Sequence, residues 1–214
     1  MMALVKQALG QVVDLANAEA QQDIDLDSIL SALESSNEQE RREAIQMISL
    51  LSESDVSTIL STLMNLAEYE DPSSVTELAF FVLEQHLTDD VLKWLINCLS
   101  SESPFVRNQA IELLQRAPQA LAPFIPDLLR HRDPDVRIFT VDILGLLPHT
   151  DVPKWLEQVL MSEEHVNVIG TAIDRVTQLA DPSLAPAVEQ VKQRFSTTPY
   201  IVFCCDIALK RFGE

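Results

Sequence analysis

Residues 133–137 read Asp133-Pro134-Asp135-Val136-Arg137, and this stretch decides the fold because it returns along the chain. The chain reads Ser103-Pro104-Phe105-Val106-Arg107 thirty residues earlier. In both copies apolar residues then recur at helical spacing. Proline at the first position of a helix loses no needed hydrogen-bond donor, so each copy marks the start of a helix. We therefore expect repeated helices with a period of about 30 residues.

The arginine of this motif defines a slot that can be followed through six copies. The slot falls at positions 41, 76, 107, 137, 167 and 202, with spacings of 35, 31, 30, 30 and 35 residues. A second motif supports the period, because Asp-Val-Leu-Lys-Trp-Leu at 90–95 returns 61 residues later as Asp-Val-Pro-Lys-Trp-Leu at 151–156. No stretch shows the strict two-residue alternation of a strand. The sequence therefore predicts an all-α fold.

One helix pair of this size cannot bury its apolar face alone, so the copies must stack into an α-solenoid of about six pairs. First helices are expected near 26–35, 54–69, 88–101, 118–131, 151–161 and 182–195. Second helices are expected near 37–51, 73–86, 104–116, 134–147, 164–179 and 199–212. Asp71, Ser103 and Asp133 are expected to cap second helices.

A further helix is expected at 3–18, where Leu4, Ala8, Val12 and Ala16 share one face. It would cap the first repeat or dock into another protomer. The expected organisation is a capping or docking segment at 1–20 and a single elongated repeat domain at 21–214.

The stretch 124–137 resembles the central signature of HEAT repeats. It has a proline within the first helix, a Leu-Leu pair, and Asp-Pro-x-Val-Arg opening the second helix. The short period, with Leu144-Gly145-Leu146-Leu147, is most similar to the bacterial HEAT-like repeats named after phycobilisome lyases. The resemblance covers roughly 24–212 and implies an α-α superhelix whose second helices line a concave face.

The resemblance also implies that the motif arginine pairs with an acidic group in the neighbouring repeat. Arg41, Arg107 and Arg137 are therefore predicted to form a ladder, with Asp133 as a structural cap. The ladder is not expected to be continuous, because Thr76, Asn167 and Val202 occupy the same slot.

The chain is acidic, with 33 Asp and Glu against 15 Lys and Arg and a formal net charge of −18. The first 107 residues hold 19 acidic and 5 basic side chains, and the remainder holds 14 and 10. This balance opposes binding to nucleic-acid phosphates or to an anionic membrane. Three cysteines are too few for a disulfide framework, and no membrane span or secretory signal is expected. We expect a cytoplasmic protein.

The sequence offers little catalytic chemistry. Its 4 glycines form no phosphate-binding loop, and its 4 histidines do not follow a metal-ligand spacing. Cys204 and Cys205 are adjacent and would point about 100° apart on a helix. We expect no enzyme activity, no cofactor and no metal.

In HEAT-like solenoids the residues just after the arginine slot project into the groove. Apolar residues at such positions are candidates for binding a partner: Leu78, Phe81, Ile138, Phe139, Val168, Ile169 and Phe203. The alternative is lateral packing between adjacent second helices, or an alignment that is wrong by one residue. Arg130, Arg132 and Arg137 form the densest basic patch, which could hold a partner's carboxylate or phosphate or could be ordinary turn surface.

The favoured hypothesis is a non-enzymatic scaffold or adaptor that binds another protein, possibly a basic one, through its concave face. The alternative, implied by the resemblance alone, is a lyase-like subunit acting on a tetrapyrrole-protein linkage. A HEAT-like DNA glycosylase is disfavoured by the net charge of −18. The sequence does not determine the oligomeric state.

Overall fold

The computed structural model describes residues 25–213, and every regular element among them is a helix. The expected helix at 3–18 and the boundary near residue 20 lie outside the described residues. The contacts divide the chain into two compact units, Met1–Trp94 and Leu95–Glu214, so that the division runs through α6 (Asp89–Cys98). No helix within 25–213 combines the length and the apolar character that crossing a membrane requires.

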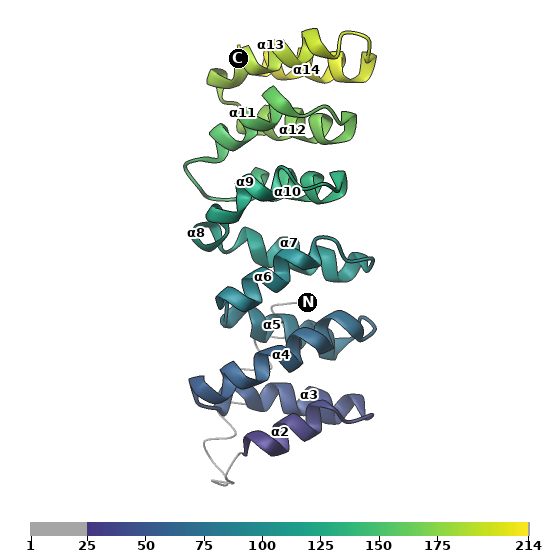
Figure 1. The fold of residues 1–214 in the computed structure, drawn as a ribbon, viewed down its shortest axis with the longest axis vertical. Coiled ribbons are helices and arrows are strands. Elements are labelled where there is room, and N and C mark those ends of the chain that lie inside the picture. The colour runs from purple at the N-terminus through teal and green to yellow at the C-terminus, as the bar shows by residue number, and fades with distance from the viewer. Residues whose placement is uncertain (1–24, 214) are drawn as a thin grey trace. The chain divides into compact units, whose positions relative to one another are not determined.

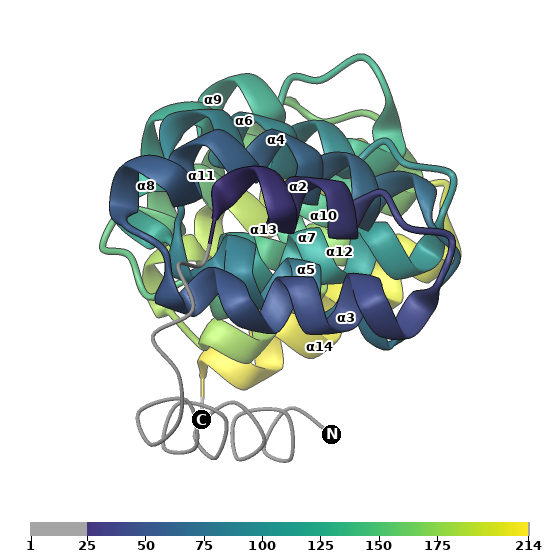
Figure 2. The ribbon, with the colours of Figure 1, turned by 90° about the horizontal axis from the view of Figure 1, so that it is seen from below.

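The first unit contains two complete helix pairs. Helix α2 (Leu26–Leu33) pairs with α3 (Glu38–Met47), and α4 (Glu53–Tyr69), which follows the short turn η1 (Ile48–Leu50), pairs with α5 (Ser74–Gln85). Figures 1 and 2 show α2 beside α3. The interior between α4 and α5 is formed by side chains with no exposed surface: Ile59, Leu63, Ala67, Val75, Ala79 and Leu83.

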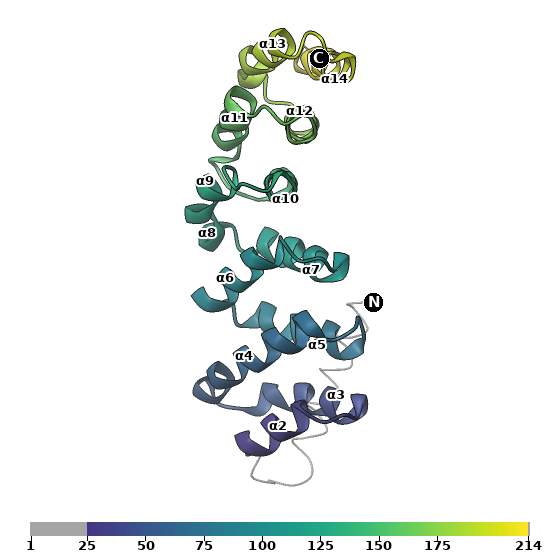
Figure 3. The same cartoon turned by 45° about the vertical axis from the view of Figure 1, so that its right-hand side comes forward.

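In the second unit the second helices pack on one another in order. These are α7 (Pro104–Gln115), α10 (Pro134–Leu146), α12 (Val166–Leu179) and α14 (Pro199–Phe212). The first-helix layer consists of α8 (Pro118–Leu121), η2 (Ala122–Phe124), α9 (Ile125–Leu128), α11 (Val152–Ser162), η3 (Pro182–Leu184) and α13 (Ala185–Arg194). Figure 3 shows α11 and α13 on one side and α12 and α14 on the other. The all-α, repeated architecture expected from the sequence is confirmed.

The expected helices at 37–51 and 182–195 each divide into an α-helix and a short 3-10 turn, and one expected helix is broken further. The range 118–131 was predicted as a single first helix, but it consists of α8, η2 and α9. Pro118, Pro123 and Pro126 lie within this range. Because a proline inside a helix removes a backbone donor and its ring clashes with the preceding turn, the chain forms three short segments instead.

The caps of the second helices follow the sequence at two of three positions. Asp133 accepts a hydrogen bond from the amide of Asp135, and Ser103 accepts one from the amide of Val106. The prediction for Asp71 is wrong, because Ser73 is the cap of α5. The hydroxyl of Thr76 accepts a hydrogen bond from the amide of Ser73, which completes a capping box that Asp71 could not form.

Two of the three motif arginines hold a carboxylate of the next repeat. Arg137 donates Nε and Nη2 to the Glu163 carboxylate at 2.7 and 3.1 Å, and Arg41 donates the same two groups to Glu70 at 3.2 and 2.6 Å. No carboxylate pairs with Arg107 among residues 25–213. The arginine ladder is therefore interrupted at Arg107 as well as at the expected gaps. At Arg107 the motif arginine is present, but it has no carboxylate partner among the described residues.

Glu163 performs two tasks at the start of α12. Besides holding Arg137, its Oε1 accepts hydrogen bonds from the amides of Glu164 and His165 at 3.0 and 2.8 Å. Burial opposes the ionised form of Glu163, but the hydrogen bonds and charge of Arg137 and these two amides outweigh it. The pKa of Glu163 therefore lies below its ordinary value.

We predict that Glu163→Gln destabilises the protein by about 2 kcal/mol at pH 7, because a charge-assisted bidentate pair is lost. Since the pKa of Glu163 is lower in the folded state, its contribution is complete above the pKa of the unfolded chain. It is lost as the pH falls through the folded-state pKa. Urea unfolding of both proteins between pH 7 and pH 3 should show the difference shrinking with acidity; a constant difference would contradict this account.

Candidate protein-binding surface

Three of the seven predicted partner-binding residues are in the core. Leu78 is 6% exposed, and Val168 and Ile169 have no exposed surface. Ile169 accordingly cannot contact a partner unless the fold opens. For these three residues the expectation of an accessible groove position is wrong, and lateral packing between helices accounts for them.

The other four residues differ in exposure. Phe81, Ile138 and Phe139 are half-buried, and only Phe203 is exposed, at 63%. The Phe139 ring lies under the guanidinium of Arg107, whose Cζ is 5.5 Å from the ring centroid. The candidate residues on α10 and α14 are therefore separated by α12, whose two candidates are buried. Whether these four residues bind a partner stays a prediction.

Three of the ten exposed large apolar residues within 25–213 lie together on the last helix. Tyr200, Phe203 and Ile207 on α14 are 59%, 63% and 47% exposed. Their spacing of three and four residues places them on one side of the helix. The opposite side carries Ile201, Cys205 and Ala208, none with exposed surface. Helix α14 is thus apolar on both sides, one packed and one open, and we call Tyr200, Phe203 and Ile207 the α14 stripe.

The sequence analysis found Phe203 but not Tyr200 or Ile207. The signal was present, since the range 199–212 holds more apolar residues than one buried side needs. The arginine-slot alignment through Val202 points to single positions rather than to a whole helix side.

The stripe lies next to α12. A Cβ built on Gly170 of α12 would come within 3.2 Å of Cε1 and 3.4 Å of the hydroxyl of Tyr200. Because residue 170 is a glycine, the Tyr200 ring can pack against α12 while most of the tyrosine surface stays exposed. Helix packing, and not side-chain hydrogen bonding alone, fixes the position of the stripe.

Two titrating groups of α14 have raised pKa values. The pKa of Tyr200 is raised, chiefly by a hydrogen bond with Cys204 and by the charge a Cys204 thiolate would carry, with burial and Asp174 adding to the effect. Burial, followed by the charges of Cys204 and Asp206, raises the pKa of Cys205 to about 11. A thiol with that pKa is a poor nucleophile at neutral pH.

The charged groups around the stripe are of both signs. Asp174 of α12 is exposed and lies 3.7 Å from the guanidinium of Arg175, and Asp206 of α14 pairs with Lys192 of α13 at 2.6 Å. Lys210 and Arg211 lie in the last turn of α14. Within residues 25–213 no three His, Cys, Asp or Glu side chains gather in a way that could hold a metal ion.

Comparison with known proteins supports the fold. No protein-family model and no curated protein matches the sequence. A solved structure titled as the basis of microtubule plus-end tracking by XMAP215, CLIP-170 and EB1 matches with a TM-score of 0.53 and 14% identity, covering 85% of this chain and 90% of that one. The chain has the fold of armadillo- and HEAT-like helical-repeat proteins.

Two further structures belong to the same architectural group but are more distant. A designed armadillo repeat protein in complex with the peptide (KR)4 matches at TM-score 0.43 and 17% identity, covering 88% of this chain and 99% of that one. The complex of CpcE and CpcF of phycocyanin lyase from a Nostoc species matches at 0.35 and 16%, covering 91% and 97%. At these identities the likeness concerns the fold alone.

We predict that Gly170→Ala stabilises the protein by about 0.5 kcal/mol. Alanine favours the helix by about 1 kcal/mol over glycine, and the exposed Tyr200 ring can shift by the few tenths of an ångström that a new methyl group requires. Urea unfolding measures the change.

Gly145→Ala is the matched control, because its Cβ would lie 2.3 Å from Cδ of Arg175, which pairs with Asp142 at 3.1 Å. We expect Gly145→Ala to stabilise the protein less than Gly170→Ala does, or to destabilise it. If Gly170→Ala destabilises as much as Gly145→Ala, the Tyr200 ring is held more firmly than its exposure indicates.

Proposed function

We propose that this chain is a non-enzymatic helical-repeat adaptor that binds another protein through the α14 stripe. The observation that carries the proposal is the open, apolar side of α14, where Tyr200, Phe203 and Ile207 are about half exposed or more. Aromatic and aliphatic side chains gathered on one exposed helix side are typical of an interaction surface. The expected absence of enzyme activity is part of this proposal.

The spacing of the stripe suits a helical partner segment. Seven residues separate Tyr200 from Ile207, which corresponds to about 10 Å along the helix axis. An amphipathic helix presents anchors at the same three- and four-residue intervals, and its apolar face can lie along such a stripe. Tyr200 adds a hydroxyl at one end, where a polar group of the partner can form a hydrogen bond.

Charge favours a basic flank on the partner. The net charge of −18 attracts cationic segments at long range, and exposed Asp174 lies on the helix next to the stripe. Lys210 and Arg211 occupy the far end of α14, so the basic residues of the partner should lie toward α12. The proposed partner is thus an amphipathic segment with apolar anchors and a basic flank.

Photo-crosslinking tests the proposal directly. With benzoylphenylalanine in place of Phe203, the chain should form an adduct with a partner protein, identifiable by mass spectrometry. The same group in place of Met161, which is 44% exposed on α11 in the first-helix layer, is the matched control and should form none. An adduct made of two copies of the chain would replace the proposed partner with self-association, and equal yields at both positions would overturn the site.

The double substitution Phe203→Ser and Ile207→Ser should then weaken the crosslinked complex by tenfold or more, as the loss of interface anchors usually does. Stability should change little, since both side chains are exposed. Ile169→Ser is the contrasting variant: a fully buried side chain becomes polar, so it should destabilise the fold by several kcal/mol. Unfolding of the double variant at the same urea concentration as Ile169→Ser would contradict the assignment.

A further inference from the structure

A second candidate surface centres on Arg107 of the second unit, which shares one contact with the motif arginines Arg41 and Arg137. Arg41, Arg107 and Arg137 all donate Nη1 to the backbone carbonyl six residues earlier, at 2.7, 2.6 and 2.7 Å. This shared bond fixes the three guanidinium groups in the same orientation relative to their helices. In Arg41 and Arg137 the remaining Nε and Nη2 edge holds a glutamate.

The residue that should supply the glutamate for Arg107 can be identified by its backbone role. Glu163 lies two residues before the N-cap of α12 and accepts a hydrogen bond from the amide of that N-cap residue, His165, at 2.8 Å. His131 lies two residues before the N-cap of α10, and its Nδ1 accepts from the amide of that residue, Asp133, at 3.2 Å. His131 thus occupies the position of Glu163 but brings no carboxylate.

The edge of Arg107 remains without an acceptor. Its Nε is buried and forms no hydrogen bond within residues 25–213. The Phe139 ring, 5.5 Å from Cζ, offsets part of the positive charge through its π face but offers no in-plane acceptor for the N–H groups. A buried donor without an acceptor destabilises the folded state, so an added acceptor would be favourable.

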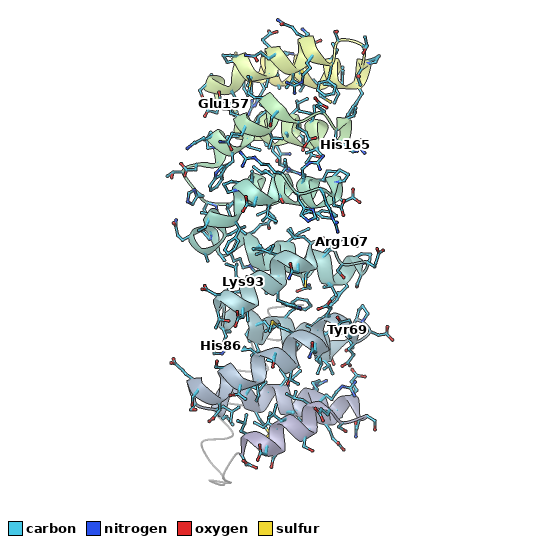
Figure 4. All side chains as sticks on the ribbon, in the orientation of Figure 1. Tyr69, His86, Lys93, Arg107, Glu157 and His165 are labelled. Carbon is cyan, nitrogen blue, oxygen red and sulfur yellow. The ribbon has the colours of Figure 1, made fainter. Side chains whose placement is uncertain are left out.

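The turn that carries His131 holds charges of both signs. Arg130 and Arg132 flank His131 and are exposed, and Asp133 and Asp135 follow them. Arg137 is close as well, since it donates to the carbonyl of His131 at 2.7 Å, but its charge is already matched by Glu163. Figure 4 shows Arg107 at the edge of the molecule formed by the turns before the second helices, the edge that also carries His165. Arg107 as a whole is half-buried, so part of its side chain reaches the surface, although Nε itself is covered.

We infer that Arg107 binds a carboxylate of an acidic side chain on a partner protein, with Arg130 and Arg132 attracting it. The incoming carboxylate takes the place that Glu163 has at Arg137 and accepts from Nε and Nη2 of Arg107. A planar group with two oxygens matches the guanidinium edge, as the two complete pairs demonstrate. This inference does not rest on the α14 stripe.

The test uses the Nε–H signal of Arg107 in NMR spectra of the full chain, assigned by its loss in Arg107→Lys. Hexaglutamate peptide at low ionic strength should shift this signal in a saturable way, and hexaglutamine should not. In His131→Glu the chain supplies its own carboxylate, so hexaglutamate should no longer shift the signal. His131→Gln, which adds no charge, is the matched control and should keep the response.

Urea unfolding gives a second measurement. His131→Glu should unfold at a higher urea concentration than His131→Gln, because the new ion pair completes the ladder. The inference is overturned if hexaglutamate leaves the Arg107 signal unmoved, or if it shifts that signal equally in His131→Glu. A shift with inorganic phosphate but not with hexaglutamate would replace the carboxylate with a phosphate group. The Phe203→Ser and Ile207→Ser variant should respond like the original chain, so failure here is distinguishable from failure of the proposed adaptor function.

Discussion

The structure depends on the need of each helix pair to bury apolar surface that its own two helices cannot cover. In the second unit α12 packs against α10 on one side and α14 on the other, and this double contact leaves Val168, Ile169 and Ala172 without exposed surface. Burial of this kind stabilises by about 25 cal/mol per Å², so every apolar side chain between two second helices contributes to the stack. Most of the circumference of α12 is therefore part of the core.

This constraint explains which parts of the sequence analysis succeeded. Helix positions follow from local signals, namely the proline starts, the caps and the 3.6-residue period, and the expected bounds agree closely with those observed. The break in the range 118–131 arises from local chemistry too, since three prolines lie there. These prolines favour a break in the helix, whereas the repeat alignment predicts one continuous helix. For Asp71, the neighbouring Ser73 and Thr76 form a reciprocal pair, which is stronger than a single cap.

The binding residues were less predictable, because moving by one residue along a helix rotates the side-chain direction by about 100° around the helix axis. Ile169 and Phe203 were grouped by their distance from the arginine slot, yet one is fully buried and the other is 63% exposed. That difference depends on whether helices pack on both sides of the residue, which is a property of the stack and not of the local pattern. The pairing of the arginines with carboxylates also depends on the stack and not on the local pattern. Glu70 lies 29 residues beyond Arg41, and Glu163 lies 26 residues beyond Arg137.

An acidic chain that presents both an apolar stripe and an arginine without a carboxylate raises the question of how opposite charge preferences can coexist. Net charge acts at long range, but at physiological ionic strength the Debye length is about 8 Å, so the groups at the contact decide which side chains are accepted. The net charge of −18 selects against strongly acidic proteins as they approach. Once a partner has docked, the guanidinium of Arg107, with no carboxylate of its own among residues 25–213, can stabilise one carboxylate at short range. The two preferences therefore apply at different distances, and together they favour a partner whose charges are mixed and ordered rather than uniformly basic.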